Sequence, residues 1–134
     1  MKLFTPEEAN EALEMVRPLT AELVRERRRL ERRRAELGAV RAKVAGNGGD
    51  FDNVEISQAQ DEADEALTGV EHAIAALDEL GVQVKDLDRG LIDFPALHPA
   101  DGAIVLLCWH LGEDGVRFWH GVEEGFAGRK PLPF

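Results

Sequence analysis

Two apolar repeats, each with a spacing of seven residues, constrain the fold of this chain more than any other feature of its sequence. A glycine-rich stretch, Gly46-Asn47-Gly48-Gly49-Asp50, separates them. A seven-residue apolar repeat keeps one stripe of a helix turned toward a partner helix. The repeats consist of Val16, Leu23, Leu30, Leu37 and Val44, and then of Ile56, Ala63, Val70 and Leu77. We therefore predict long helices over residues 6–45 and 54–80.

The glycine-rich stretch predicts a turn at residues 46–53 that folds the second helix back on the first. An antiparallel arrangement pairs Leu30 with Val70 and Leu23 with Leu77, and the midpoint of both pairs is Asp50, inside the turn. The pairs Val44–Ile56 and Leu37–Ala63 have the same midpoint. Residues 1–81 are thus predicted to form a long antiparallel coiled-coil helical hairpin.

The ends of the hairpin carry their own signals. Thr5 and Glu8 have the spacing of a capping box, in which each side chain accepts a hydrogen bond from the backbone N–H of the other residue. Gly81 suits the left-handed position that ends a helix. Pro18 lies within the first apolar run and cannot donate a hydrogen bond to the carbonyl of Glu14. We therefore expect a kink or a break at Pro18.

The second helix has a further apolar row, formed by Leu67 and Ile74, which the first helix does not match along its middle. The facing positions there are polar: Glu26, Arg27, Arg33 and Arg34. Either the C-terminal segment or a second copy of the chain must cover this row. We predict a homodimer on this ground.

Seven arginines lie between Arg25 and Arg34 and could form a patch for nucleic acid or phosphate. Alternatively they line a solvated helix face, because glutamates stand three or four positions from most of them. The net charge is -10, divided into +3 over residues 1–45 and -13 over residues 46–134. Phosphate groups would be repelled by most of such a molecule. The solvated face is favoured, and nucleic acid is an unlikely partner.

Length and composition set the remaining bounds. A chain of 134 residues fits a single domain, 1–134. No apolar run is long enough to cross a membrane, so we expect no membrane association. The one cysteine, Cys108, excludes an internal disulfide and suits a reducing compartment, so a cytoplasmic location is expected.

Residues 82–134 have the alternation and turn residues of short strands. We predict strands over 82–84, 91–95, 103–109 and 116–119, with Pro95 closing the second. A small antiparallel β-meander at one end of the hairpin follows. The fold class is predicted to be α+β, mainly α.

This segment also carries motifs that resemble those of the uncharacterised prokaryotic family catalogued as domain of unknown function 2203. The motifs are Lys85-Asp86-x-Asp88-x-Gly90-Leu91-Ile92-Asp93-Phe94-Pro95, Leu107-Cys108-Trp109-x-x-Gly112-Glu113, Trp119-His120 and Gly125-Phe126-Ala127-Gly128-Arg129. Near the N-terminus, Phe4-Thr5-x-Glu7-Glu8-Ala9-Asn10 and Arg17-Pro18-Leu19 are similar as well. The resemblance covers essentially the whole chain and implies no activity or catalytic residue.

The same segment holds the candidate metal ligands. Cys108 and His110 are two residues apart and hence on one face of a strand. Further candidates are Asp86, Asp88, Asp93, Glu113 and His120. We place any site around Asp93, Glu113 and His120, with Cys108 as an additional ligand for zinc, iron or manganese. The alternative is structural, with a buried cysteine and histidines that only form hydrogen bonds.

Other chemistry has less support. Arg129, in a glycine-rich segment, could bind an anion or pair with a nearby acid, and Trp109 and Trp119 could line a ligand cleft or belong to the core. Structural roles are favoured for all three. Cys108 is a poor candidate for a nucleophile because a cysteine in mid-strand is usually enclosed.

The sequence leaves two functions open. The first is a non-enzymatic interaction or adaptor protein that uses its hairpin and self-association, with a protein partner. The second is a small metal- or ligand-binding protein, which includes a metal-dependent hydrolase, with its site in the C-terminal motifs.

Overall fold

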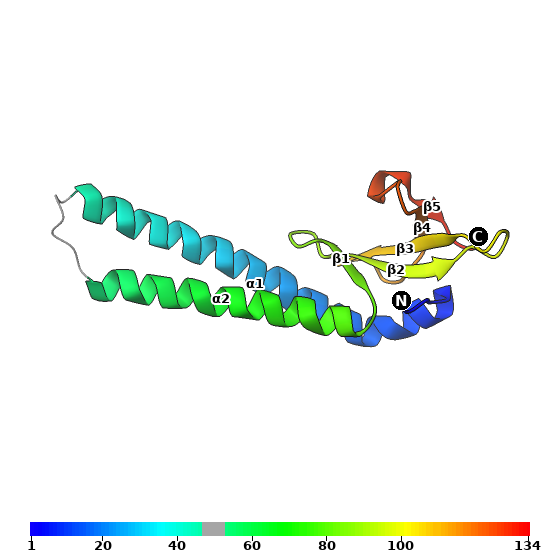
Figure 1. Cartoon of the computed structure of the whole chain (residues 1–134), viewed down its shortest axis with the longest axis horizontal. Coiled ribbons are helices and arrows are strands. Elements are labelled where there is room, and N and C mark those ends of the chain that lie inside the picture. Colours follow the sequence, from blue (N-terminus) through cyan, green and yellow to red (C-terminus); the bar gives the residue numbers. More distant parts are fainter. Residues whose placement is uncertain (47–52) are drawn as a thin grey trace.

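The computed structural model describes residues 1–46 and 53–134, so the turn predicted at 46–53 falls mostly outside the described residues. Helices α1 (Pro6–Gly46) and α2 (Asn53–Glu79) pack against each other, and a five-stranded antiparallel sheet follows them. Figure 1 shows the two helices running antiparallel and projecting far beyond the sheet. The predicted class, α+β and mainly α, is confirmed. Neither helix has, in its described part, an apolar stretch that could cross a membrane.

The predicted helix ends are confirmed by hydrogen bonds and backbone angles. The N–H of Thr5 lies 3.2 Å from Glu8 Oε1, and the N–H of Glu8 lies 3.1 Å from Thr5 Oγ1. Together they form the reciprocal capping box, which satisfies two helix-terminal donors. At the end of α2, Gly81 has φ of 88°, where a side chain would be strained.

Pro18 does not break α1, which runs continuously from Pro6 to Gly46. Figure 1 shows α1 changing direction in its blue, N-terminal part, so the helix bends there and goes on. Proline removes one hydrogen bond from the helix ladder and bends its axis. Core contacts on both sides of the bend hold the helix together, since Val16 and Leu23 are both fully buried in the same core.

The apolar stripes of both helices are buried where α1 and α2 pack, except for Val44 and Ile56 at the outer end, which are half-buried. Leu23, Leu30, Val70 and Leu77 all belong to the buried core, and Leu37 and Ala63 are buried farther out. Leu67 and Ile74, the row without a partner in the prediction, are half-buried and pack against this core. Their coverage is therefore partial within one chain.

Part of the arginine-rich stretch pairs with acids on both helices. Arg29 lies 3.3 Å from Glu26 and 3.3 Å from Glu65, and Arg33 lies 2.9 Å from Glu36 and 3.5 Å from Glu62. These contacts support the prediction of a solvated, ion-paired face.

The strands follow one another in the sheet in chain order: β1 (Gln83–Asp86), β2 (Leu91–Leu97), β3 (Ile104–His110), β4 (Phe118–Gly121) and β5 (Lys130–Pro131). A short 3-10 helix, η1 (Phe126–Gly128), precedes β5. The sequence did not predict β5 or η1, because neither is longer than three residues and neither has an apolar alternation.

Pro95 does not close β2, contrary to the prediction, and the strand continues to Leu97. The carbonyl of Pro95 accepts a hydrogen bond from the N–H of Phe4 at 2.7 Å, so this backbone edge points away from β3. β1 pairs with β2 only as far as Asp93, so Pro95 faces no strand on that side. A proline costs no ladder hydrogen bond at such a position.

The two faces of the sheet have different partners. Ile92, Phe94, Leu107 and Trp109 alternate onto the inner face and share one core with the N-terminal part of α1. The outer face carries the intervening residues. Figure 1 shows the red C-terminal segment over the sheet on the side away from the blue part of α1. The outer face is enclosed as well, since Asp93, Cys108 and His120 on it are buried.

Candidate metal centre

Three neighbouring strands bring Asp93, Cys108 and His120 together on the outer face. Asp93 of β2 stands directly opposite Cys108 of β3. His120 of β4 stands opposite Leu106, which is two residues from Cys108 and so on the same face. One donor atom from each of the three residues lies within 4.8 Å of the other two.

All three side chains are enclosed: Cys108 is 0 % exposed, Asp93 1 % and His120 2 %. The orientation of the imidazole is fixed by the backbone, since His120 Nδ1 lies 2.8 Å from the carbonyl oxygen of Gly121. A carbonyl only accepts hydrogen bonds, so Nδ1 carries a hydrogen and donates it. In the neutral ring the lone pair is then on Nε2.

His120 Nε2 points at the carboxylate of Asp93 and lies 3.3 Å from each of its two oxygens. A charge-assisted N–H···O hydrogen bond is usually about 2.7–2.9 Å long. The observed spacing is therefore loose for a direct ion pair. A proton or a cation is needed between these groups, because a bare nitrogen lone pair and a carboxylate repel each other.

Burial sets the protonation of the other two groups. It raises the pKa of Asp93, an effect that the nearby His120 opposes. Burial and the neighbouring Asp93 raise the pKa of the Cys108 thiol to about 12. Without a cation at the site, Cys108 is therefore a neutral thiol at physiological pH.

These features exclude a Cys–His–Asp catalytic triad. In such a triad the acid binds one ring nitrogen of histidine and the nucleophile binds the other. Here Nδ1 bonds the carbonyl of Gly121 and Nε2 faces Asp93, so neither ring nitrogen is left for Cys108. A thiol with a raised pKa and no exposure is also a poor nucleophile.

The same features fit a metal ion. Histidine ligands commonly donate the other ring N–H to a carbonyl or carboxylate, as His120 does to Gly121. Zinc bonds to nitrogen and oxygen are about 2.1 Å long, which at a tetrahedral angle separates the two ligand atoms by about 3.4 Å. The 3.3 Å between His120 Nε2 and Asp93 is close to this value. The described part of the chain thus contains a buried Asp–Cys–His group that could hold a metal.

Glu113, which we placed beside Asp93 and His120, does not join this cluster. Its carboxylate lies 2.7 Å from the guanidinium of Arg129 and accepts a hydrogen bond from the N–H of His110 at 2.9 Å. The turn after β3 folds back on the end of that strand, so Glu113 accepts a hydrogen bond from the last residue of β3, His110. Its charge is neutralised by Arg129, which leaves it a poor metal ligand.

The side chains considered for ligand binding already contact other residues of the chain. The guanidinium of Arg129 also stacks on the rings of Phe118, at 4.1 Å, and Phe126, at 4.6 Å. Trp109 is fully buried and donates its indole N–H to the carbonyl of Glu113. These contacts agree with a structural role for both residues.

Trp119 is half-buried on the inner face, where its ring contacts those of His98 and Phe134 at 5.0 and 5.4 Å. It stands opposite Leu107 in the β3–β4 register. The two tryptophans are therefore diagonal neighbours and do not form a directly opposed pair.

The remaining ligand candidates have local roles. His110 Nδ1 lies 2.9 Å from the carbonyl oxygen of Leu111, and Asp86 accepts hydrogen bonds from the backbone N–H groups of Asp88 and Arg89 in the β1–β2 turn. The sequence grouped Cys108 with His110 because both lie on one strand face. It missed Gly121, whose backbone carbonyl orients His120, and no side-chain signal could have revealed that role.

Comparison with known proteins gives a family. The family described as "Uncharacterized conserved protein (DUF2203)" matches residues 2–132 of the chain. The chain belongs to this family. Asp93, Cys108 and His120 all lie in the part of the DUF2203 chain that matches. No curated protein and no solved structure gave a match.

Proposed function

We propose that this DUF2203 protein binds one divalent transition-metal ion through Asp93, Cys108 and His120. The observation that carries the proposal is the buried convergence of a carboxylate, a thiol and an oriented imidazole from three adjacent strands. Zinc fits this set better than manganese, because a cysteine ligand favours zinc or iron while manganese prefers oxygen ligands. Cys108 can serve as a ligand only while its sulfur is reduced, which suits a reducing compartment such as the cytoplasm.

A structural role for the metal is supported better than hydrolysis. Catalytic zinc sites combine three protein ligands with a position that substrate or water can reach. The three side chains here are at most 2 % exposed, so a substrate has no route to them. The ion would tie β2, β3 and β4 together on the face that the helices do not cover.

Metal analysis of protein purified without an affinity tag tests this proposal. We expect about one zinc per chain in the wild-type protein and less than about a tenth of that in Asp93→Ala, Cys108→Ser and His120→Ala. His98→Ala is the matched control, because His98 lies beside Trp119 on the opposite face of the sheet. Its metal content should equal that of the wild type.

Thermal unfolding gives a second measurement that does not depend on the recovery of metal during purification. After chelator treatment, added zinc should raise the Tm of wild-type and His98→Ala protein but leave that of His120→Ala unchanged. If the wild-type protein holds no zinc, iron or manganese and added zinc does not move its Tm, the three residues form a structural hydrogen-bond cluster and the proposal fails.

We propose partner binding by the helical hairpin as a second function, in which the protein acts as a coiled-coil adaptor and homodimer. The supporting observation is the length of hairpin that projects beyond the sheet (Figure 1). Sedimentation over a range of concentrations tests self-association: the mass should rise from the 14.8 kDa of one chain to twice that value. A mass that stays at one chain throughout contradicts the homodimer.

A further inference from the structure

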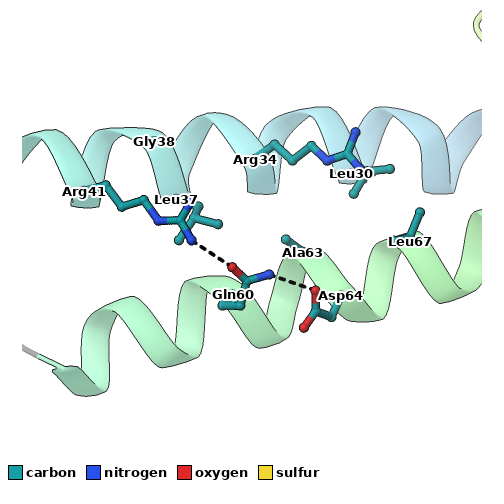
Figure 2. Close-up of a pocket in the computed structure, with 9 residues that line it drawn as sticks. All are labelled: Leu30, Arg34, Leu37, Gly38, Arg41, Gln60, Ala63, Asp64 and Leu67. Atoms are coloured by element: carbon teal, nitrogen blue, oxygen red, sulfur yellow. Dashed lines mark hydrogen bonds between the residues drawn. The ribbon is translucent and has the colours of Figure 1, made fainter.

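The projecting part of the hairpin contains a hollow of about 360 Å³ between α1 and α2. Figure 2 shows its lining: Leu30 and Leu37 of α1 and Ala63 and Leu67 of α2 form an apolar floor, while arginines stand on the α1 side. The volume lies within the range of about 300–1,000 Å³ common for binding pockets. The hollow opens over Gly38, where an added Cβ would meet no atom within 4 Å.

The face of α1 that borders this hollow is already covered nearer the sheet. Thr20 and Val24 lie on it, and a Cβ added at Gly90 of the β1–β2 turn would lie only 2.8 Å from Thr20 Cγ2 and 3.1 Å from Val24 Cγ2. Arg27 lies on the same face and pairs with Asp88 of that turn at 3.3 Å. A segment carrying a carboxylate thus covers the stripe where it passes the sheet.

Arg34 and Arg41 repeat the position of Arg27 at intervals of seven residues and hence share its face. Arg34 is exposed and has no ion pair with any residue in 1–46 or 53–134. Arg41 donates to the side chain of Gln60 at 3.1 Å, and Gln60 donates in turn to Asp64 (Figure 2). The uncovered stretch therefore combines an apolar floor with two guanidinium groups. Arg34 has no acidic partner among residues 1–46 and 53–134, and Arg41 is bonded to the neutral amide of Gln60.

We infer that this groove docks an amphipathic, acidic α-helical segment of a partner protein. An apolar side chain of that segment would rest on Leu37 and Leu67, and its carboxylates would meet Arg34 and Arg41 as Asp88 meets Arg27. Helix-in-groove recognition of this kind uses apolar anchors one or two turns apart. This inference rests on the partner-binding function proposed above and is independent of the metal.

A synthetic helix of about 18 residues, with leucines on one stripe and flanking glutamates, is the probe, and a twin with lysines in place of the glutamates is its control. Fluorescence anisotropy with the full-length protein should show the acidic peptide binding at least about tenfold more tightly than the basic twin. The double variant Arg34→Glu, Arg41→Glu should weaken binding of the acidic peptide by about tenfold or more. Arg28→Glu, on another face of α1, should leave it unchanged.

Gly38 supplies a pair of variants that test the hollow itself. Gly38→Leu fills it and should weaken peptide binding about tenfold, whereas Gly38→Ala adds one methyl group in open space and should leave binding nearly unchanged.

The inference would be overturned if the protein bound the acidic and basic peptides with equal affinity. It would also be overturned if the double variant Arg34→Glu, Arg41→Glu and the variant Gly38→Leu both bound the acidic peptide as tightly as the wild type. A homodimer that Gly38→Leu dissociates would overturn it as well, because the occupant would then be a second copy. If peptide binding fails while an intact dimer sediments, only this inference falls and the partner-binding function stands.

Discussion

At the residue scale, glycine at position 90 shows how close approach dictates identity. Gly90 has φ of 65°, and a Cβ there would lie 2.8 Å from Thr20 Cγ2 and 3.0 Å from Leu111 Cβ. The β1–β2 turn can therefore rest on α1 only because this residue has no side chain. Packing therefore explains the glycine at position 90 of its motif, while Asp93 of the same motif lies in the candidate metal centre.

We predict that Gly90→Ala lowers the free energy of unfolding by about 2–4 kcal/mol, because left-handed strain adds to overpacking. Chemical denaturation measures the change. The matched control is Gly102→Ala, which has φ of 70° but open space around its Cβ. It should cost only the strain, about 1–2 kcal/mol. Equal costs for the two variants would contradict the close approach.

Cys108 gives a second prediction at this scale. Its pKa is raised to about 12 and its side chain is fully buried, so the thiolate that reacts with disulfide reagents is scarce and enclosed. In chelator-treated native protein at pH 8, labelling should be at least about 100-fold slower than in denaturant. Fast labelling of the native protein would mean that the outer face of the sheet opens readily.

At the element scale, side chains from one segment secure the ends of others. Asn10 of α1 accepts a hydrogen bond from the N–H of Val116 at 2.8 Å and donates to its carbonyl at 3.2 Å, which fixes the β3–β4 connection to the helix. Glu113 and Arg129 join that connection to the segment after η1. These contacts hold the β3–β4 connection and the segment after η1 in place beside the outer face of the sheet.

We predict that Glu113→Ala lowers the free energy of unfolding by about 2–3 kcal/mol, because Arg129 and the N–H of His110 lose a charged partner. Glu113→Gln should cost less, since its amide oxygen can still accept both hydrogen bonds. Metal content should be unchanged in both variants. Loss of metal from folded Glu113→Gln protein would show that Glu113 is a ligand after all.

At the scale of the whole molecule, the shape is set by the difference in length between the hairpin and the sheet. α1 has 41 residues and is therefore about 60 Å long, while the longest strands have seven residues. The sheet covers the hairpin only near one end, as Figure 1 shows. The rest of the hairpin buries its apolar stripe by helix pairing alone.

This shape predicts a radius of gyration well above the value of about 14 Å for a compact chain of this length. A rod as long as α1 alone has a radius of gyration of about 18 Å. Small-angle X-ray scattering, with the mass taken from the same data, measures it. A monomer near 14 Å would mean that the hairpin folds back on the sheet.

The sequence by itself determined the helical hairpin, its capping box and its fold class. These depend on residues close together in the chain: Leu30 and Leu37 one heptad apart, or Thr5 and Glu8 within one turn. The strand content was also predictable from alternation, although Pro95 was misjudged. Its effect depends on whether another strand lies beside it, and only the tertiary structure decided that β1 ends before Pro95.

The sequence identified each residue of the candidate metal centre as a possible ligand, but it centred the site on Asp93, Glu113 and His120. The structure brings Cys108 and not Glu113 beside the other two. Asp93, Cys108 and His120 are distant in the chain, and strand register alone places them together. A shift of one residue would turn a side chain to the other face of the sheet. Glu113 was assigned to the site because hairpin geometry allowed it, and Arg129, sixteen residues later, holds it elsewhere. Local spacing therefore fixed the elements, while contacts between distant residues fixed the chemistry.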